Sequence, residues 1–130
     1  MKYQEILDAS IGMIGESGST GNVGDYAERA TYLMGTFCSQ CLPVDRKYRI
    51  SKGEIPEEIT VPSCVTLSDS FPLSTVFVPA ATYYIAAMLI LEENEDISET
   101  LFGHYTDAIA SIQNDLLASR HSIKNNYPLE

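Results

Sequence analysis

The chain has 130 residues, of which 45% are hydrophobic and 20% charged, and its 18 acidic and 8 basic residues give a formal net charge of −10. A chain of this size can bury a core without disulfides or metal, so the sequence predicts one folded domain over residues 1–130 and excludes extensive disorder. The acidic balance argues against a protein that wraps duplex DNA non-specifically, because such binding needs a broad Lys/Arg surface.

Membrane insertion and secretion are both disfavoured. The longest apolar run, residues 76–91, is shorter than the ~20 residues that span a bilayer, and it contains Pro79 and two tyrosines. The first ten residues lack the apolar core of a signal peptide, and three cysteines are an odd set for a disulfide framework. We therefore expect a soluble protein made in the cytoplasm, without membrane contacts.

The chain begins with a helical pattern. Apolar side chains recur every three or four residues over 2–16, which predicts the first helix. Four glycines within residues 15–24 then predict a flexible loop. The spacing of Gly18, Gly21 and Gly24 suggests a phosphate-binding loop, but no Gly-Lys-Ser/Thr follows and no strand precedes it, so a plain linker is favoured.

A second helix is predicted from Asp25 to Leu42. Asp25 is the expected N-cap, with Glu28 three residues later as its partner in a capping box. The apolar stripe of this helix continues to Cys41 at steps of three or four residues. Leu42-Pro43 is expected to end the helix, because the residue before a proline avoids the helical conformation.

Residues 44–71 are the least regular part of the chain. Hydrophobic and polar residues alternate around Ile59 and Val61 and again around Val65 and Leu67, which indicates a short hairpin or an extended arm. A connection of this length inside one domain is usually functional or mobile.

A third helix is predicted over residues 75–93. Its start can be as late as Val78, because Pro79 fits only the first turn of a helix. Apolar residues occur all round it, so neighbours are expected on more than one side, and its alanines would let another helix approach closely. So wide an apolar surface also suggests that the helix needs more cover than a chain of 130 residues provides.

A fourth helix is expected to begin at Asp96, with Glu99 as the capping partner. Three cations near its end suit the negative pole of the helix dipole, namely Arg120, His121 and Lys124. The expected buried face consists of Ile97, Leu101, Tyr105, Ala108, Ile112 and Leu116. The predicted fold class is therefore all-α, a four-helix bundle-like domain with an irregular arm or short hairpin between the second and third helices.

Side chains that could carry chemistry do not form a recognisable set. Cys38 and Cys41 form a C-x-x-C motif, but a zinc site would need a second pair of ligands, and Cys64, His104 and His121 show no such pairing. A redox motif would open a helix after a strand, whereas this one closes a helix, so two small buried residues are the favoured interpretation. His104 lies beside the buried face of the fourth helix, which favours a packed or edge histidine over a general base.

Known catalytic and calcium-binding spacings are also missing from the sequence. No Gly-x-Ser-x-Gly with a suitable histidine occurs, and the acidic run lacks the D-x-D-x-D-G spacing of a calcium loop. We therefore expect a protein without enzymatic activity, catalytic residues, cofactor, bound metal or small-molecule substrate.

Two charge clusters are the candidate partner contacts. Five carboxylates lie within residues 92–99 and four basic residues within 46–52. A solvated turn is the plain interpretation of the acidic run, and a patch for a basic partner surface, such as the basic cluster of an identical neighbouring subunit, is the functional one. DNA contact by the basic cluster is a weaker alternative at a net charge of −10. The candidate contact residues are Arg46, Lys47, Arg49, Lys52, Glu92, Glu93, Glu95 and Asp96.

Several helical segments and one acidic turn follow one another in an informative order. They are DYAERA at 25–30 with Tyr32-Leu33, PAATYYIAAML at 79–89, EENED at 92–96, and Tyr105 with residues 109–112. In this order they resemble the small head–tail connector (adaptor) proteins of long-tailed bacteriophages and prophages. Residues 44–71 match nothing in that family.

The resemblance implies a virion protein, a helical bundle whose copies assemble into a ring below the portal, extend the DNA channel and dock the tail. The implied partners are further copies of the chain, the portal, and tail or stopper proteins, with DNA passing through without specific binding. The family has no catalytic residue to carry over. Two alternatives remain: a small acidic phage-encoded regulatory or inhibitory protein that masks a basic host surface, and another tail-completion protein.

Overall fold

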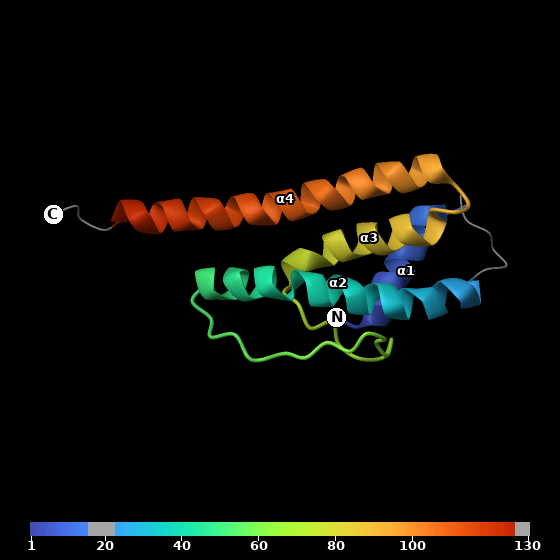
Figure 1. The fold of residues 1–130 in the computed structure, drawn as a ribbon, viewed down its shortest axis with the longest axis horizontal. Coiled ribbons are helices and arrows are strands. Elements are labelled where there is room, and N and C mark those ends of the chain that lie inside the picture. The colour runs from blue at the N-terminus through green and yellow to red at the C-terminus, as the bar shows by residue number, and fades with distance from the viewer. Residues whose placement is uncertain (16–22, 127–130) are drawn as a thin grey trace.

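The computed structural model describes residues 1–15 and 23–126, with side chains placed for 1–15 and 24–118. The elements in chain order are α1 (Tyr3–Ile14), α2 (Val23–Ser51), the 3-10 helix η3 (Thr75–Phe77), α3 (Val78–Ile90) and α4 (Glu95–Asn126). The described part of the chain forms no strand, so the predicted all-α, bundle-like fold is confirmed. Figure 1 shows α3 between α2 and α4, with α1 crossing behind it.

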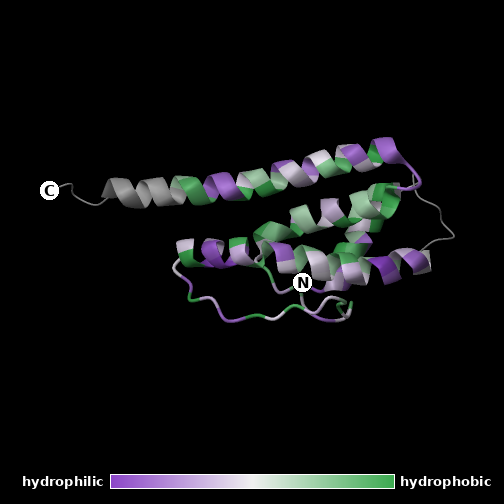
Figure 2. Cartoon of the chain, in the orientation of Figure 1, coloured by the Kyte–Doolittle hydropathy of each residue, from purple (hydrophilic) through white to green (hydrophobic). Residues whose placement is uncertain are grey.

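Helix α3 is the centre of the molecule. It packs against α1, α2 and α4, and every residue in it except Pro79 is buried or half-buried. Figure 2 shows α3 hydrophobic along most of its length, whereas α4 alternates between hydrophobic and hydrophilic residues. The predicted neighbours on more than one side are therefore confirmed. The expectation that α3 needs cover from outside the chain is wrong, because the other three helices already enclose it.

Small side chains let α1 and α4 approach α3 closely. Ser10 Oγ on α1 lies 2.8 Å from Ile6 O and 3.1 Å from Thr82 O on α3. Ser98 Oγ on α4 donates to Ala87 O of α3 at 2.8 Å. Both hydroxyls are buried, and each is satisfied by a backbone carbonyl, so the contacts leave no orphaned polar atom.

Helix α2 is longer at both ends than predicted. It begins at Val23, so Asp25 is not the N-cap but lies in the first turn and pairs with Arg29 at 3.7 Å. It also continues through Pro43 to Ser51, so the predicted end at Leu42 is wrong. Proline removes one hydrogen bond of the helix, and tertiary contacts of the turns beyond it outweigh that loss.

Two side chains of α2 bind backbone groups at the two ends of the η3–α3 segment. Asp45, fully buried on α2, accepts the Ser74 N–H at 2.9 Å where the segment begins. Arg29, sixteen residues earlier on α2 and about 24 Å away along the axis, donates to Met88 O at 3.0 Å and Leu89 O at 3.5 Å. Helix α2 thus satisfies backbone groups at both ends of the buried segment.

Residues 52–74, which we name the strap, connect α2 to η3 without a hairpin. The first N–H groups of α1 donate to strap carbonyls, Tyr3 N to Asp69 O at 3.1 Å and Gln4 N to Leu67 O at 3.0 Å. The extended-arm alternative is therefore the correct one. Leu67 O accepts from the start of α1, which offers unsatisfied donors, and Val65 N–H donates to Thr31 O of α2, so these two residues do not pair with another strand.

The acidic turn closes differently from the predicted cap. Helix α3 ends at Ile90, and Asn94 Oδ1 accepts the Ile97 N–H at 3.2 Å, so Asn94 caps α4. Asp96 lies inside the first turn of α4, so its predicted capping role is wrong. Asn and Asp are nearly equal as N-caps, and the sequence offers both within three residues. The predicted buried face of α4 is confirmed, since each of its six residues is buried or half-buried.

We predict that Gly35→Ala destabilises the fold. A Cβ at this position would meet Pro62 O at 2.7 Å as well as Ser63 O, and backbone atoms of the strap would have to move. The expected loss is about 1–3 kcal/mol of unfolding free energy, with faster amide exchange at Val65, whose N–H donates to Thr31 O at 3.1 Å. Chemical denaturation measures the loss of unfolding free energy, and hydrogen exchange measures the exchange rate of the Val65 amide.

The control is Gly103→Ala on α4, where an added Cβ meets nothing within 4 Å. This variant should gain up to about 1 kcal/mol from helix propensity. Equal effects of the two substitutions would contradict the close contact between α2 and the strap.

A second prediction compares two Asp–Arg pairs of the same helix and spacing. Asp45→Ala removes a buried carboxylate 2.8 Å from Arg49 Nε and leaves the Ser74 N–H without its acceptor, so a loss of about 3 kcal/mol is expected. Asp25→Ala breaks a 3.7 Å pair whose side chains are 58% and 38% exposed, and should cost less than about 1 kcal/mol. Urea unfolding of both variants measures these losses, and similar values would contradict the role of Asp45 in holding the start of the η3–α3 segment.

Candidate functional site

The first candidate surface is the turn between α3 and α4. Glu92, Glu95 and Asp96 are exposed there and form no ion pair within the described residues; we name these three the acidic end. They lie at the N-terminus of α4, where the helix dipole favours negative charge. Leu91 stands beside them with 43% of its surface exposed. The acidic end therefore combines an apolar side chain with a carboxylate rim.

Glu93 belongs to the same run but is used inside the chain. The buried Tyr26 hydroxyl donates a hydrogen bond to its carboxylate, which ties the turn to the start of α2. The structure thus separates Glu93 from the three outward-facing carboxylates.

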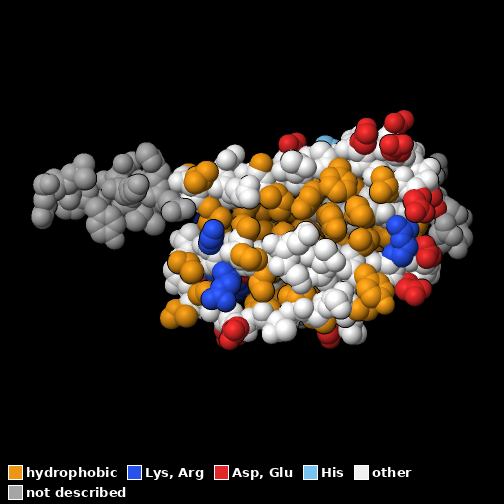
Figure 3. Space-filling view, in the orientation of Figure 1, with side chains coloured by type: hydrophobic (Ala, Val, Ile, Leu, Met, Phe, Trp, Pro, Cys, Tyr) orange, Lys and Arg blue, Asp and Glu red, His pale blue; other side chains and the backbone are white. Residues whose placement is uncertain are grey.

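The second candidate surface lies at the far end of α2. Arg46, Lys47 and Lys52 are exposed, and Lys52 Nζ sits 5.5 Å from the centroid of the Tyr48 ring; we name these three the basic end. Ile50, 60% exposed, lies among them. Because α2 continues past Pro43, these cations stand on a helix and not in an irregular arm. Figure 3 shows Lys and Arg side chains over this end of the molecule and carboxylates over the α3–α4 turn.

Arg49 points into the molecule and not toward a partner. Its Nε donates to Asp45 at 2.8 Å and its Nη2 to Pro72 O at 3.0 Å. The hydrogen bond with Asp45 raises the pKa of the guanidinium above its ordinary value. Arg49 therefore fastens the end of the strap to α2, and only three of the four predicted basic contacts face solvent.

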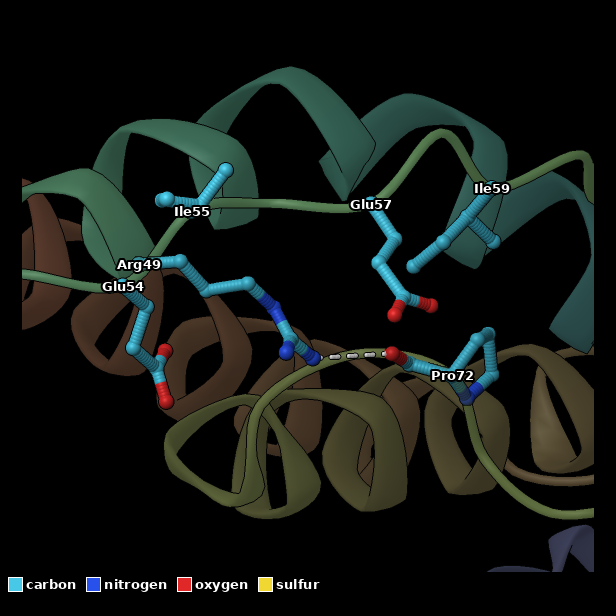
Figure 4. A pocket seen from close by; sticks show the side chains of 6 residues that line it. All are labelled: Arg49, Glu54, Ile55, Glu57, Ile59 and Pro72. Atoms are coloured by element: carbon cyan, nitrogen blue, oxygen red, sulfur yellow. Dashed lines mark hydrogen bonds between the residues drawn. The ribbon is translucent and has the colours of Figure 1, made fainter.

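An open cleft of about 520 Å³ lies between the end of α2 and the strap. Figure 4 shows Arg49 reaching across it to Pro72, with Glu54 and Glu57 on the strap side. Ile55 and Ile59 complete its lining, and Ile55 is 94% exposed. The ionisable side chains that line the cleft are Arg49, Glu54 and Glu57, and Arg49 is already bonded to Asp45 and Pro72 O.

The cysteines do not converge on a site. Cys38 and Cys41 are buried in the core, as predicted, and Cys64 is exposed 3.4 Å from the Thr31 hydroxyl. Burial raises the pKa of the Cys38 thiol to about 12 and that of Cys41 to about 11. Both are therefore protonated at neutral pH and are poor nucleophiles or metal ligands.

The histidine and glycine predictions have mixed outcomes. His104 is an edge histidine, exposed and tilted against the Tyr83 ring with ring centroids 5.3 Å apart. The His121 side chain, Gly18 and Gly21 lie outside what the structure describes. No three His, Cys, Asp or Glu side chains among the described residues come together as metal ligands.

A third surface was not predicted from the sequence. Aromatic side chains from α2, α3 and α4 gather in one cluster. The Phe37 ring is 5.8 Å from Tyr84 and 6.2 Å from Tyr105, and Phe102 lies 5.7 Å from Tyr105. Burial raises the pKa of both tyrosines. Phe102 remains 37% exposed. The spacing of Phe102 and Tyr105 on one side of α4 was the available signal, but it suggested core packing alone.

Comparison with known proteins gives no match: no protein-family model, no curated protein and no solved structure is similar to this chain. None of the helices formed by the described residues is long and apolar enough to cross a membrane. The functional argument therefore depends on the geometry of the surfaces themselves.

The thiols provide a test of the core around α2. In the native protein one thiol, that of Cys64, should react with an aromatic disulfide reagent at neutral pH, and all three should react in denaturant. Because folding raises the pKa of Cys38 and Cys41 above the ordinary 9.0, their contribution to stability is complete below pH 9. It should be lost as the pH rises from 9 toward 12. Rapid reaction of three native thiols would contradict their burial.

Proposed function

We propose that the chain is a structural subunit that assembles with copies of itself, and that its role is that of a head–tail connector in a phage or prophage virion. The observation that supports assembly is the separation of opposite charges. Tyr26, which bonds to Glu93, marks the acidic end, and Arg46 is twenty residues further along α2, about 30 Å away. Charges this far apart do not attract each other within one chain, because screening extends only about 8 Å at physiological salt.

The two ends are complementary between copies. The basic end of one copy presents Arg46, Lys47 and Ile50, and the acidic end of another presents Glu95, Asp96 and Leu91. Each exposed ion pair contributes little affinity, but the pairs orient the two copies as they meet. The apolar side chains Ile50 and Leu91 supply additional binding free energy. A contact between two different surfaces of the same chain is heterologous, and it generates a ring if the rotation closes.

Among self-assembling structural roles, that of a head–tail connector agrees with the family that the sequence resembles. A ring below the portal would extend the DNA channel and dock tail or stopper proteins, and the net charge of −10 suits a wall along which DNA slides without binding. The complementary basic end favours this role over that of an acidic inhibitor, which needs only the acidic surface. Another tail-completion protein would share the self-assembly.

Charge reversal tests the assembly. The variant Glu95→Lys with Asp96→Lys has two basic ends, and Arg46→Glu with Lys47→Glu has two acidic ends, so each alone should be monomeric. An equimolar mixture restores both contacts and should regain the wild-type mass in light scattering. High salt should weaken the wild-type assembly, since screening shortens to about 3 Å at 1 M.

The matched control is Asp8→Lys with Asp107→Lys, two exposed positions on α1 and α4 outside both ends. This variant changes the net charge by the same amount as the acidic-end variant and should assemble like the wild type. A monomeric wild type at every concentration, with no recovery on mixing the two reversed variants, would contradict self-assembly.

A portal-binding assay separates the connector from its alternatives. Wild-type protein should co-purify with the portal protein encoded near it, and electron microscopy should show added density below the portal ring. Capture of one stoichiometric host enzyme and no virion protein would instead support the inhibitory protein.

A further inference from the structure

The strap follows an extended course over residues 54–62. This stretch contains no helix, turn or bend, and Figure 1 shows the strap as an open trace along α2. Ile55, Glu57 and Ile59 line the cleft beside α2, and the steps of two residues between them are those of a β-strand. The first half of the strap therefore presents its side chains as a strand does.

The backbone of residues 55–61 has no partner within the described chain. The nearest backbone hydrogen bonds on either side are made by Glu54 N with Arg49 O at 3.0 Å and by Val65 N with Thr31 O at 3.1 Å. Alternate residues of a strand turn their N–H and C=O groups to opposite edges. Pro56 has no N–H, so the edge formed by the odd-numbered residues is the complete one. A free edge of this kind is a template for a further strand.

The cleft beside this edge has an excess of negative charge. The guanidinium of Arg49 is offset by the buried carboxylate of Asp45, whose Oδ2 lies 2.8 Å from Arg49 Nε. Glu54 and Glu57 remain in the walls, and neither belongs to an ion pair of the described residues. The two isoleucines of the cleft add apolar surface for the stem of a lysine or arginine. The cleft thus suits a long cationic side chain.

We propose that the strap binds an extended, basic segment of a partner protein as an added β-strand, with one lysine or arginine of that segment in the cleft between Glu54 and Glu57. Backbone hydrogen bonds along residues 55–61 supply affinity, and the cleft selects the side chain. The inference does not depend on the head-to-tail assembly proposed above, which uses the acidic and basic ends.

A second copy of the chain does not fit as the occupant. Two straps paired antiparallel over residues 55–61 would place Glu58 of one copy opposite Glu58 of the other, and like charges in that position destabilise a sheet. The Lys and Arg residues of the chain lie on α2 or α4 or in the turn after α2, except Lys2, which is already bridged to Ser70. The basic extended segment must therefore come from another protein.

A synthetic peptide tests the pairing. The probe is TVTKTVT with both termini blocked, in which valine, lysine and valine on one face match Ile55, Glu57 and Ile59 in either strand direction. Added to the isotope-labelled full-length protein, it should shift the amide resonances of residues 55–61. It should also slow the exchange of the Glu57 and Ile59 amides more than that of Glu58, because the odd-numbered residues form the pairing edge. The peptide TVTETVT, with the opposite charge, should bind at least about tenfold more weakly.

Two charge reversals locate the cation. Glu57→Lys should weaken TVTKTVT at least about tenfold and should bind TVTETVT more tightly than the wild type does. This gain shows that the variant is folded. Glu58→Lys is the matched control, because it changes the net charge equally at an exposed position that does not line the cleft. It should change the affinity for either peptide by no more than about threefold.

Three results would overturn the proposal. They are the absence of any resonance shift up to the solubility limit of TVTKTVT, shifts confined to the acidic end, and equal effects of Glu57→Lys and Glu58→Lys. The last two would show a non-specific attraction of a cation to an acidic protein. None of them bears on head-to-tail assembly, which light scattering of the charge-reversed variants tests separately.

Discussion

The fold depends on burying one helix on all sides while satisfying the backbone groups at its ends. Helix α3 lies inside α1, α2 and α4, so solvent cannot supply partners for the donors and acceptors that every helix end leaves open. Asp45 accepts from Ser74 where the buried segment begins, and Arg29 donates to Met88 and Leu89 where it ends. Both charged groups belong to α2, and Asp45 lies beyond Pro43, so its bond to Ser74 helps to explain why the helix continues through that proline.

The strap meets the same requirement at the N-terminus of α1, where backbone donors also need acceptors. Arg49 binds Pro72 O, so the end of α2 and the approach to η3 are close, and a short connection would join them. The chain instead makes a long excursion that brings Asp69 and Leu67 carbonyls to the N-terminus of α1. The excursion closes over Gly35, where only a residue without a side chain leaves room for the strap backbone. The irregular segment is thus part of the core structure.

The helical periodicity of the sequence was enough to predict α1 and the buried face of α4, and Pro79 set Val78 as the latest start of the third helix, which was predicted over 75–93 and ends at Ile90. These features depend on local spacing, which a single sequence displays directly. The end of α2 was predicted wrongly because the contacts that sustain it lie in distant parts of the chain. Asp45 resembles an ordinary surface residue in sequence, and only the fold shows that it is buried.

The candidate surfaces were predicted in the same uneven way. Charge runs are visible in a sequence, so both clusters were found, but which members bond to other parts of the same chain was not. Glu93 and Arg49 each have a partner from a distant segment, Tyr26 and Pro72 respectively, and no local pattern reports it. The aromatic cluster of Phe37, Tyr84, Phe102 and Tyr105 was missed because its members come from α2, α3 and α4. Surfaces assembled from several elements exist only after folding.

The two contacts of α2 with the ends of the η3–α3 segment also restrict how the protein can change in length. Arg29 and Asp45 hold two ends of one buried segment, so a residue inserted between them would displace one end by about 1.5 Å and rotate its side chain by about 100°. Helix α2 and the η3–α3 segment must therefore gain or lose residues together. Residues 16–22 and the end of α4 lie outside this constraint. Among relatives of this chain, variation in length should be concentrated there, while the interval between Arg29 and Asp45 should remain constant.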